Sequence, residues 1–490
     1  MAVIKHPDTA DKAGDYNLSH IDLINHKGEI IDLKYIVVEM NIYESIYKNA
    51  VTGSVVITDA KNQMGRLEVQ GLERIAFKLF SPGTNDASDQ VDASVETGEP
   101  FHVYKITDRK QVNQGLLVYT LHFASREFMR NIRTKVSQAY KGRPDSMVQS
   151  ILKDPEYLDT RKKLKYERCA NSDTIVIPNM RPFDAINMIA TKSLPDKSDG
   201  VGYYFYETVK SFHFRSWESM VSSQGTNVRP IKQKFYYMPL KYKDEAVGNK
   251  IQHDFQSVQE YRFINNFHDV AANTAMGTYA HNVITYNIFD KSYQKIDYNY
   301  EYEFAQTKHT EVANEKSDRE RYAVAASSFV DEDEKKISDY NESRVSLQST
   351  TQFLHNEEKG AGYGINVLQD GRKYAERESQ INQVTNGTSL HMVVKGQSYI
   401  EAGDLINFNM LAVDSYNLDN LYDPQYSGKY VITKIRHQVN SQKYTMALEC
   451  AKDSVKRGFS LNDFKIQKNR NVPDLRNTYS AEDPEPYGSL

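Results

Sequence analysis

The amino-acid sequence predicts an α+β protein that is mainly β, with two β-rich regions and a small α/β region inserted between them. Every second residue is large and apolar or aromatic over 117–123 in the first β region, and the same spacing runs over 444–450, ending at Cys450, in the second. This spacing is typical of β-strands with one buried face. At Arg126 the pattern changes to helical spacing. The 490 residues are enough for more than one packed core.

The first β region is expected over residues 19–125. A long mixed apolar run covers 35–46, and strands are predicted at 51–59, 74–80, 101–107 and 117–123. The last two should pair across a turn that contains Gln, Asn and Gly, whereas residues 82–99 are rich in Gly, Asp, Ser and Thr and predict a loop. Residues 1–18 are polar and are expected to form an N-terminal arm without a core of its own.

The α/β insert domain is expected over residues 126–250. Helices are predicted at 126–140 and 144–153, and a third helix should begin at Pro182, because proline is favoured at the first helical position and Phe183, Ile186 and Ile189 follow at helical spacing. Strands are predicted at 203–207 and 212–217.

The second β region is expected in two parts, 251–304 and 388–455, with a polar helical and loop insertion at 305–387 between them. Residues 296–304 alternate Ile, Tyr, Tyr, Tyr and Phe with polar residues, which predicts one strand along the whole segment. Further strands are predicted at 389–394, 404–410, 429–435 and 444–450. Residues 456–490 are polar and are expected to be a C-terminal extension.

One segment of the first β region has an echo in the second. Residues 53–60 read Gly-Ser-Val-Val-Ile-Thr-Asp-Ala, and residues 428–435 read Gly-Lys-Tyr-Val-Ile-Thr-Lys-Ile. Each follows a loop that contains tyrosine. Two interpretations stand beside each other: either any two strands look alike to this degree, or the second β region is an interrupted duplicate of the first.

The composition excludes several classes of protein. The chain has 61 Lys and Arg against 65 Asp and Glu, whereas a strongly cationic nucleic-acid binder would show clustered excess basic residues. The basic stretches 126–143 and 161–168 are better interpreted as solvated helix faces than as DNA sites. The N-terminus has no apolar signal segment, and no apolar run approaches the roughly 20 residues that span a bilayer, so no membrane insertion is expected.

No catalytic, cofactor-binding or metal-binding residues are expected. The two cysteines, Cys169 and Cys450, lack metal-ligand spacing, and Cys450 should be a buried free thiol. His391 and His437 are interpreted as structural. Glu39 and Glu44 resemble the carboxylate pair of a glycosidase only in spacing, because nothing local would desolvate one of them and leave the other hydrated, so a solvated or interface face is predicted.

Several segments, taken in order, resemble the central baseplate hub proteins of T-even-like contractile-tailed bacteriophages. They are 37–46 with 53–59, 177–186 with 202–207 and 212–217, 277–279 with 298–304, and 403–408 with 427–437. The hub part of contractile secretion system spike proteins is a related family. The positions that carry the resemblance are proposed as interface or fold markers: Glu39, Asn41, Tyr43, Gly53, Asp59, Gly277, Tyr279, Gly403, Asp404, Gly428 and Tyr430.

The resemblance implies two similar tube-type β-barrel domains per chain and a homotrimer that forms a ring. Such a ring would adapt the sixfold tail tube to the threefold central spike, and the genome would pass through it without specific DNA binding. Implied partners are the central spike protein, a tail tube or tube-initiator protein, and wedge or other baseplate proteins. The implied location is the tail baseplate of the virion, after assembly in the host cytoplasm, and the implied role is not enzymatic.

Two alternatives stay open. The first is a tail-associated cell-wall hydrolase or glycan-binding protein. The second is the spike hub of a contractile secretion system. That family normally continues into an OB-fold and a repetitive β-helix, and the absence of a repeat before Leu490 argues against it.

Overall fold

The computed structural model describes residues 12–455 except 63–64, 66–68, 72, 83–89, 97–98, 198–199, 222–229, 238–246, 266–268, 289–290, 305–306, 312–333, 351–369, 413–421 and 424. Most of the expected N-terminal arm and the whole expected C-terminal extension lie outside these residues. The described chain is mainly β, as the sequence predicts. None of the described helices is long and apolar enough to cross a bilayer.

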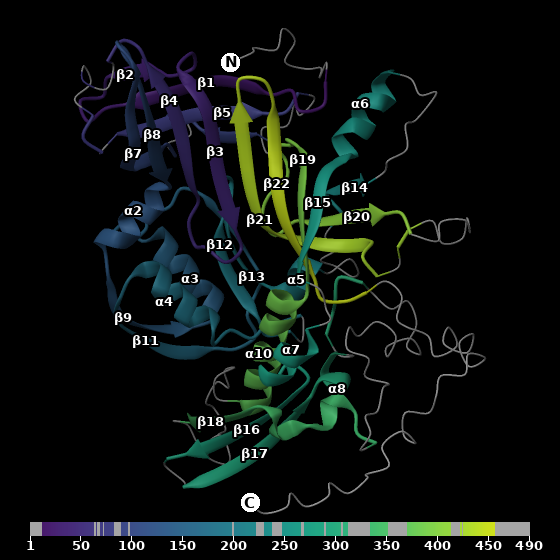
Figure 1. Ribbon diagram of the computed structural model, residues 1–490. Coiled ribbons are helices and arrows are strands. Elements are labelled where there is room, and N and C mark those ends of the chain that lie inside the picture. The colour runs from purple at the N-terminus through teal and green to yellow at the C-terminus, as the bar shows by residue number, and fades with distance from the viewer. Residues whose placement is uncertain are drawn as a thin grey trace, which may run out of the picture.

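A single large sheet of fourteen strands contains both ends of the described chain (Figure 1). Its main path runs β15-β19-β22-β21-β3-β4-β8-β7-β5-β1-β2, with β6 beside β5, and β20 between β14 and β21. The strands are β1 Asn17–Ile24, β2 Ile30–Asp32, β3 Val37–Ser45, β4 Thr52–Asp59, β5 Arg74–Phe80, β6 Val91–Ala93, β7 Phe101–Asn113, β8 Leu116–Ala124, β14 Gln233–Tyr237, β15 Val258–Asn265, β19 Thr388–Lys395, β20 Leu405–Met410, β21 Gly428–Asn440 and β22 Tyr444–Lys452.

The first and second β regions meet where β3 pairs antiparallel with β21, over Glu39–Ser45 and Lys434–Asn440. We call this pairing the seam. In Figure 1 it places the purple strand β3 beside the yellow strand β21. The strand β21 changes partner along its length: Gly428–Val431 pairs with β20, and the part from Lys434 onward pairs with β3. The register of β21 against β22 shifts between Ile432 and Lys434, where the partner changes.

One side of this sheet is the main apolar core. Alternate residues on β3, β4 and β21 point into it, among them Met40, Ile42, Val55, Ile57 and Ile432, all fully buried. On β22 the predicted face of Tyr444, Met446, Leu448 and Cys450 is buried, and Cys450 is a free thiol, so the expectation for this cysteine is confirmed. The strands predicted at 51–59, 74–80, 117–123, 389–394, 404–410 and 444–450 are likewise confirmed to within a few residues, and those predicted at 101–107 and 429–435 are confirmed but extend five or six residues further.

The insert packs against one end of the large sheet. Its helices are α2 Arg126–Arg133, α3 Pro144–Lys153, α4 Pro182–Ala190 and α5 Trp217–Val221. Its strands form two small sheets, β9 Val136–Gly142 with β11 Asp173–Met180, and β10 Lys163–Tyr166 with β13 Ser211–Ser216 and β12 Tyr203–Glu207. The predicted starts of α3 and α4, each with proline in the first turn, are confirmed.

The prediction of one helix over 126–140 is wrong. The helix α2 ends at Arg133, and Thr134 adopts an extended conformation. The chain then becomes β9, which pairs antiparallel with β11 and buries Val136 completely. The partner strand lies about forty positions further along the chain, so local spacing did not reveal this change from helix to strand.

A third part of the molecule, the small module, lies beyond the insert at the far end from β1 (Figure 1). It contains α7 Val270–Ala275, a sheet of β16 Ala280–Asn287, β17 Ser292–Asn299 and β18 Val345–Thr350, the short helices α8 Tyr300–Phe304, η3 Ile337–Asp339 and η4 Asn341–Ser343, and α10 Gly371–Asn386, which packs on the sheet. The helix α6 Val247–Gln256 contacts β14 and β19 instead. Residues 305–387 thus contribute α10, as expected of a polar helical segment, but also the strand β18.

The prediction of one strand over 296–304 is also wrong. The strand β17 ends at Asn299, and Tyr300–Phe304 is helical. The amide of Tyr300 donates to the carbonyl of Tyr279, and the two rings meet edge to face at 5.6 Å. Tyr298, Tyr300 and Phe304 are buried, but Tyr302 is 71% exposed because the helix turns it away from them.

Candidate functional site

The side of the large sheet opposite the main core is polar, and three of the predicted marker residues lie on it. On β3, Glu39, Asn41 and Tyr43 point to this side, between Val56, Ser54 and Thr52 of β4 and Asn440, Gln438 and Arg436 of β21. Tyr43 is 38% exposed. We call this side of β3, β4, β21 and β22 the polar face. It runs across the seam, so it combines residues from both β regions.

Ion pairs cover the seam on the polar face. Arg436 donates from Nε to Asn41 Oδ1 at 2.9 Å and from Nη2 to Glu39 Oε1 at 3.3 Å. Asn41 in turn donates to Glu39 Oε1 at 2.7 Å. One strand further, Lys434 donates to Glu449 Oε2 of β22 at 2.6 Å. The two cations of β21 on this face are therefore each bound by a carboxylate from a neighbouring strand.

The predicted glycines are positions where a side chain would not fit. A Cβ at Gly53 would overlap the Phe123 ring and the backbone oxygen of Asn41. Gly403 and Gly428 have positive φ angles of 83° and 130°, and a Cβ there would overlap the hydroxyl of Tyr206 and the carboxylate of Glu311, respectively. These three glycines are packing and turn positions.

The remaining markers of the large sheet are buried. Asp59 closes β4 and accepts from the amide of Lys61 at 3.0 Å. Asp404 lies in the turn before β20 and accepts from the amide of Glu401 at 3.0 Å. Tyr430 is fully buried, and its hydroxyl donates to the carbonyl of Tyr426 at 2.6 Å.

Gly277 and Tyr279 lie elsewhere, in the small module just before β16. Gly277 has a φ of 76°, and a Cβ would overlap the side chain of Arg344. Tyr279 packs against Tyr300. The structure therefore gathers the other nine markers around β3, β4, β20 and β21 and leaves these two apart.

The prediction that Glu44 lies on a solvated or interface face is wrong. Glu44 is on the core side of β3 and is only 3% exposed, whereas Glu39 is on the polar face. Its two carboxylate oxygens accept from the amides of Val209 at 2.8 Å and Ala402 at 3.0 Å. Burial, together with the nearby charge of Glu401, raises the pKa of Glu44 to about 7.

Glu401 lies in the same interface between sheet and insert. Its Oε2 accepts from the hydroxyl of Thr208 at 2.8 Å and lies 3.6 Å from His213 Nε2. Lys165 and Lys210 lie 3.5 Å and 3.8 Å from its Oε1. Burial alone would raise the pKa of Glu401, but the contacts with His213 and the two lysines outweigh burial and hold it well below its usual range.

A second buried carboxylate joins the insert to the first β region. Glu207 is fully buried and accepts from Lys162 Nζ at 2.7 Å, from the hydroxyl of Ser125 at 2.7 Å and from the amide of Val51 at 2.9 Å. Burial raises the pKa of Glu207, and the charge of Lys162 opposes that rise. No short-range sequence pattern marks Glu207 or Glu401, because each meets its partners only in the folded chain.

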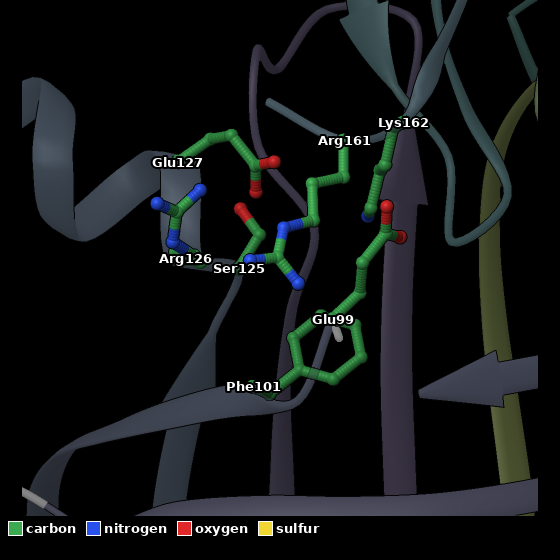
Figure 2. Close-up of a pocket in the computed structure, with 7 residues that line it drawn as sticks. All are labelled: Glu99, Phe101, Ser125, Arg126, Glu127, Arg161 and Lys162. Carbon is green, nitrogen blue, oxygen red and sulfur yellow. The ribbon is translucent and has the colours of Figure 1, made fainter. Parts of the chain in front are cut away.

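A small cavity adjoins the ion pair of Lys162 and Glu207 (Figure 2). It is lined by Glu99, Phe101, Ser125, Arg126, Glu127, Arg161 and Lys162. Its free space of about 10 Å³ is room for about one water molecule. Lys162 Nζ also lies 5.7 Å from the centre of the Phe101 ring. The cavity therefore belongs to the packed interface between sheet and insert and has no room for a sugar or a nucleotide.

A third polar cluster joins all three parts of the chain. Asp453, just after β22, accepts from the Trp217 indole of α5 at 2.9 Å and from the amide of Thr310 at 2.9 Å, and His309 Nδ1 lies 2.9 Å from the same carboxylate. Although burial opposes it, the contact with His309 and these hydrogen bonds lower the pKa of Asp453 to about 2. Sequence reasoning missed this cluster.

The described residues contain no group of three or more His, Cys, Asp or Glu side chains arranged to hold a metal ion. His391 lies on β19. His437 lies on the core side of β21, 2.7 Å from the hydroxyl of Tyr444, and burial lowers its pKa to about 3, so its ring is neutral.

No family model matches the chain. Over 427 residues the chain is 20% identical to the probable baseplate hub protein gp334 of Vibrio phage KVP40, covering 85% of this chain and 90% of that protein. The resemblance to phage baseplate hub proteins, carried in the sequence by short ordered motifs, is confirmed by this match.

Solved structures with some similarity come from phage tails and related systems. A tail protein from Neisseria meningitidis MC58 has a TM-score of 0.47 and 8% identity, over 89% of this chain and 97% of that one. The 43 kDa tail protein of prophage MuSo2 from Shewanella oneidensis has a TM-score of 0.47 and 9% identity, over 88% and 97%. The E. coli c3393 protein, a type VI secretion system component, has a TM-score of 0.39 and 10% identity, over 86% and 75%.

Proposed function

We propose that this chain is a structural baseplate hub of a contractile phage tail and is not an enzyme. The observation that carries the proposal is the extent of the sequence similarity, which spans 85% of this chain and 90% of a probable baseplate hub protein. Similarity over that extent involves the large sheet, the insert and the small module together. The proposed location is accordingly the tail baseplate of the virion, after assembly in the host cytoplasm.

Part of the large sheet supports the proposal of two similar tube-type β domains, 19–125 and 251–304 with 388–455. Of the strands in 251–304, β15 belongs to this sheet, whereas β16 and β17 lie in the small module. In the first half the antiparallel order is β3-β4-β8-β7, and in the second half it is β20-β21-β22-β19. The echoed segments take the same place in both halves, since β4 and β21 are each second in order. Val55 and Ile57 of β4 and Tyr430 and Ile432 of β21 are all fully buried.

Two like halves in one chain are what a threefold-to-sixfold adaptor needs. Three copies around an axis would present six similar β units, and the seam would hold two of them side by side in each copy. In the proposed homotrimer the polar face lines the opening, and the genome passes along it without specific binding. The central spike protein would meet the threefold side of the ring, and a tail tube or tube-initiator protein the sixfold side. Wedge or other baseplate proteins are proposed partners of the outer surface.

The strand edges favour side-chain contacts between copies. The register of β15 against β19 shifts twice, between Val258 and Glu260 and between Phe263 and Asn265. The register of β7 against β8 shifts three times. Bulges of this kind at an edge strand hinder a further strand from pairing. We therefore propose that copies meet through side chains beside β15, where Ile264 is 46% exposed, with little backbone pairing.

Light scattering and electron microscopy of the purified chain test this proposal. The expected particle is a ring of three 56.3 kDa chains with threefold symmetry and six similar inner units. Ile264→Asp should break the ring, while Tyr302→Asp, which places the same charge at another exposed site, should leave it intact. A stable monomer that binds neither tail tube nor spike proteins would contradict the proposal.

One observation favours the hydrolase alternative. Glu44 and Glu401 influence each other electrostatically and have pKa values displaced in opposite directions, which is the pattern of an acid and base pair. Both oxygens of Glu44 are, however, occupied by backbone amides. The hub proposal expects no clearing on a peptidoglycan zymogram. Clearing by the wild-type chain that is lost in both Glu44→Gln and Glu401→Gln would favour the hydrolase.

A further inference from the structure

The polar face has a specific distribution of charge at the seam. Lys434 and Arg436 project from β21 with side chains that are 50% and 43% exposed. Glu449 reaches Lys434 from one side, and Glu39 reaches Arg436 from the other. The two carboxylates come from distant parts of the chain, β22 and β3, and they meet the two cations only because the seam brings these strands together.

The Arg436 pair is held in place by a third residue. Asn41 accepts from Arg436 Nε at 2.9 Å through its Oδ1 and donates to Glu39 Oε1 at 2.7 Å through its Nδ2. Asn41 is itself buried under these side chains, at 4% exposure. The guanidinium therefore has two of its donors committed to neighbours on β3 and has fewer left for an outside phosphate.

Free cations on such a surface would interact with DNA. Each Lys or Arg that neutralises a phosphate releases counterions, and the affinity accumulates with the number of such contacts regardless of base sequence. Such affinity would slow a genome that moves along this surface, because every contact must be broken during passage. Intramolecular carboxylates that occupy the cations remove this source of retention while they keep the wall polar.

We propose that Glu39 and Glu449 mask Arg436 and Lys434 from the phosphates of double-stranded DNA, so that the seam does not hold a passing genome. This inference rests on the proposed hub function, since it assumes that the polar face lines the opening. It assigns a role to the charge balance of the seam that goes beyond forming a ring. In this role the Glu39 and Glu449 side chains lower the affinity of the seam for DNA phosphates.

Binding of a fluorescent 30-base-pair DNA duplex to the full-length chain tests the inference at several salt concentrations. The test variant is Glu39→Gln with Glu449→Gln, which retains hydrogen-bonding oxygens but removes both charges. The matched control is Glu156→Gln with Glu342→Gln. It makes the same change in net charge at two exposed carboxylates away from the seam that hold no cation within the described residues.

The seam variant is expected to bind the duplex on the order of tenfold more tightly than wild type at low salt. Its plot of log affinity against log salt should steepen by about 1.8, or about 0.9 for each freed cation. Further substitution of Lys434→Gln and Arg436→Gln should abolish the gain. Equal gains in the seam variant and the control, or a gain in neither, would overturn the inference.

This outcome is independent of the hub test. If the ring forms but the seam variant gains no affinity, the masking role fails and the hub proposal stands. If the seam variant gains affinity but no ring or partner binding is found, the electrostatic effect is real and the hub proposal fails. Circular dichroism and the melting temperature of each variant establish that the fold is intact.

Discussion

The two halves of the large sheet, β3-β4-β8-β7 and β20-β21-β22-β19, differ in how their inner edge strand is paired. In the first half, β3 covers β4 along most of its length. In the second half, β20 pairs only with Gly428–Val431 of β21 and leaves the rest of that strand open. The open part is where β3 binds. The short pairing of β20 leaves this edge of β21 open for β3, so that the two β regions form one sheet.

The insert also docks differently on the two halves. Against the first half, Lys162 and Glu207 are 4% and 0% exposed and the pair is enclosed with Ser125 and Val51. Against the second half, Glu401 meets Lys165 and Lys210, and Lys165 is 45% exposed. Burial makes the first contact costly to break, whereas water compensates for much of the second. The insert should therefore be anchored mainly on the first half.

The largest expected effect comes from breaking the buried anchor. Lys162→Met leaves the Glu207 charge buried without its partner, which should lower the free energy of unfolding by about 3–5 kcal/mol. Lys165→Met should cost less than about 1 kcal/mol, because Lys165 is itself 45% exposed and Glu401 keeps its contact with Lys210. Urea unfolding followed by Trp217 fluorescence measures both. Similar losses in the two variants would show that the insert is anchored equally on both halves.

The next effect distinguishes the echoed glycines. Gly53→Ala forces a methyl group into a buried ring and a backbone oxygen, and overpacking of this kind costs about 1–3 kcal/mol or more. Gly428→Ala meets a carboxylate that can rotate away, but its positive φ adds about 1 kcal/mol of strain. We expect the larger loss at Gly53, measured as shifts of the urea midpoint. A larger loss at Gly428 would indicate that the chain packs more tightly around Gly428 of β21 than around Gly53 of β4.

The stability of the interface should depend on pH through Glu44. Its pKa is raised from 4.5 to about 7, so the stabilising contribution of the protonated form is present below pH 4.5 and is lost as the pH rises through about 7. That displacement corresponds to about 3 kcal/mol at most. The melting temperature should fall between pH 5.5 and 8.5, and it should fall less in Glu44→Gln. An equal fall in both proteins would assign the pH dependence to other groups.

The smallest effect is expected at the seam ion pairs. Lys434 and Glu449 are 50% and 33% exposed, so a double-mutant cycle with Lys434→Met and Glu449→Gln should give a coupling energy of about 0.2–1 kcal/mol. The apolar residues of β3 and β21 hold the seam, and the charges contribute little to its stability. A coupling above about 2 kcal/mol would show that the ion pairs hold the two halves together.

Short-range patterns predicted the elements that depend on local alternation and failed where partners came from afar. The strands at 117–123 and 444–450 and the helix start at Pro182 follow from period and proline alone. The helix predicted to 140 and the strand predicted to Phe304 both extend too far. Pairing with β11 ended the first, and packing on Tyr279 ended the second.

The candidate site divides in the same way. The resemblance predicts Glu39, Asn41 and Tyr43 as markers, and they lie together on the polar face. Alternation from the buried Tyr430 and Ile432 would place Lys434 and Arg436 on the core side. Only the register shift between Ile432 and Lys434 turns them to the polar face, so spacing did not reveal them. No spacing could have revealed that Glu44 lies against Ala402 and Val209, because the contacts span about 358 and 165 positions.

The sequence by itself determined that this protein is mainly β and that it resembles baseplate hub proteins, and it showed one echoed segment whose two interpretations stayed open. These conclusions follow from the local alternation of apolar residues, from the glycines of the echoed segments and from the order of the short motifs. Only the tertiary structure decided that the two β regions share one sheet, that Glu44 is buried while Glu39 is partly exposed, and that carboxylates pair with the seam cations. Pairing at a strand edge and removal of water from a carboxylate both depend on which distant segment arrives there, and local periodicity carries no record of that segment.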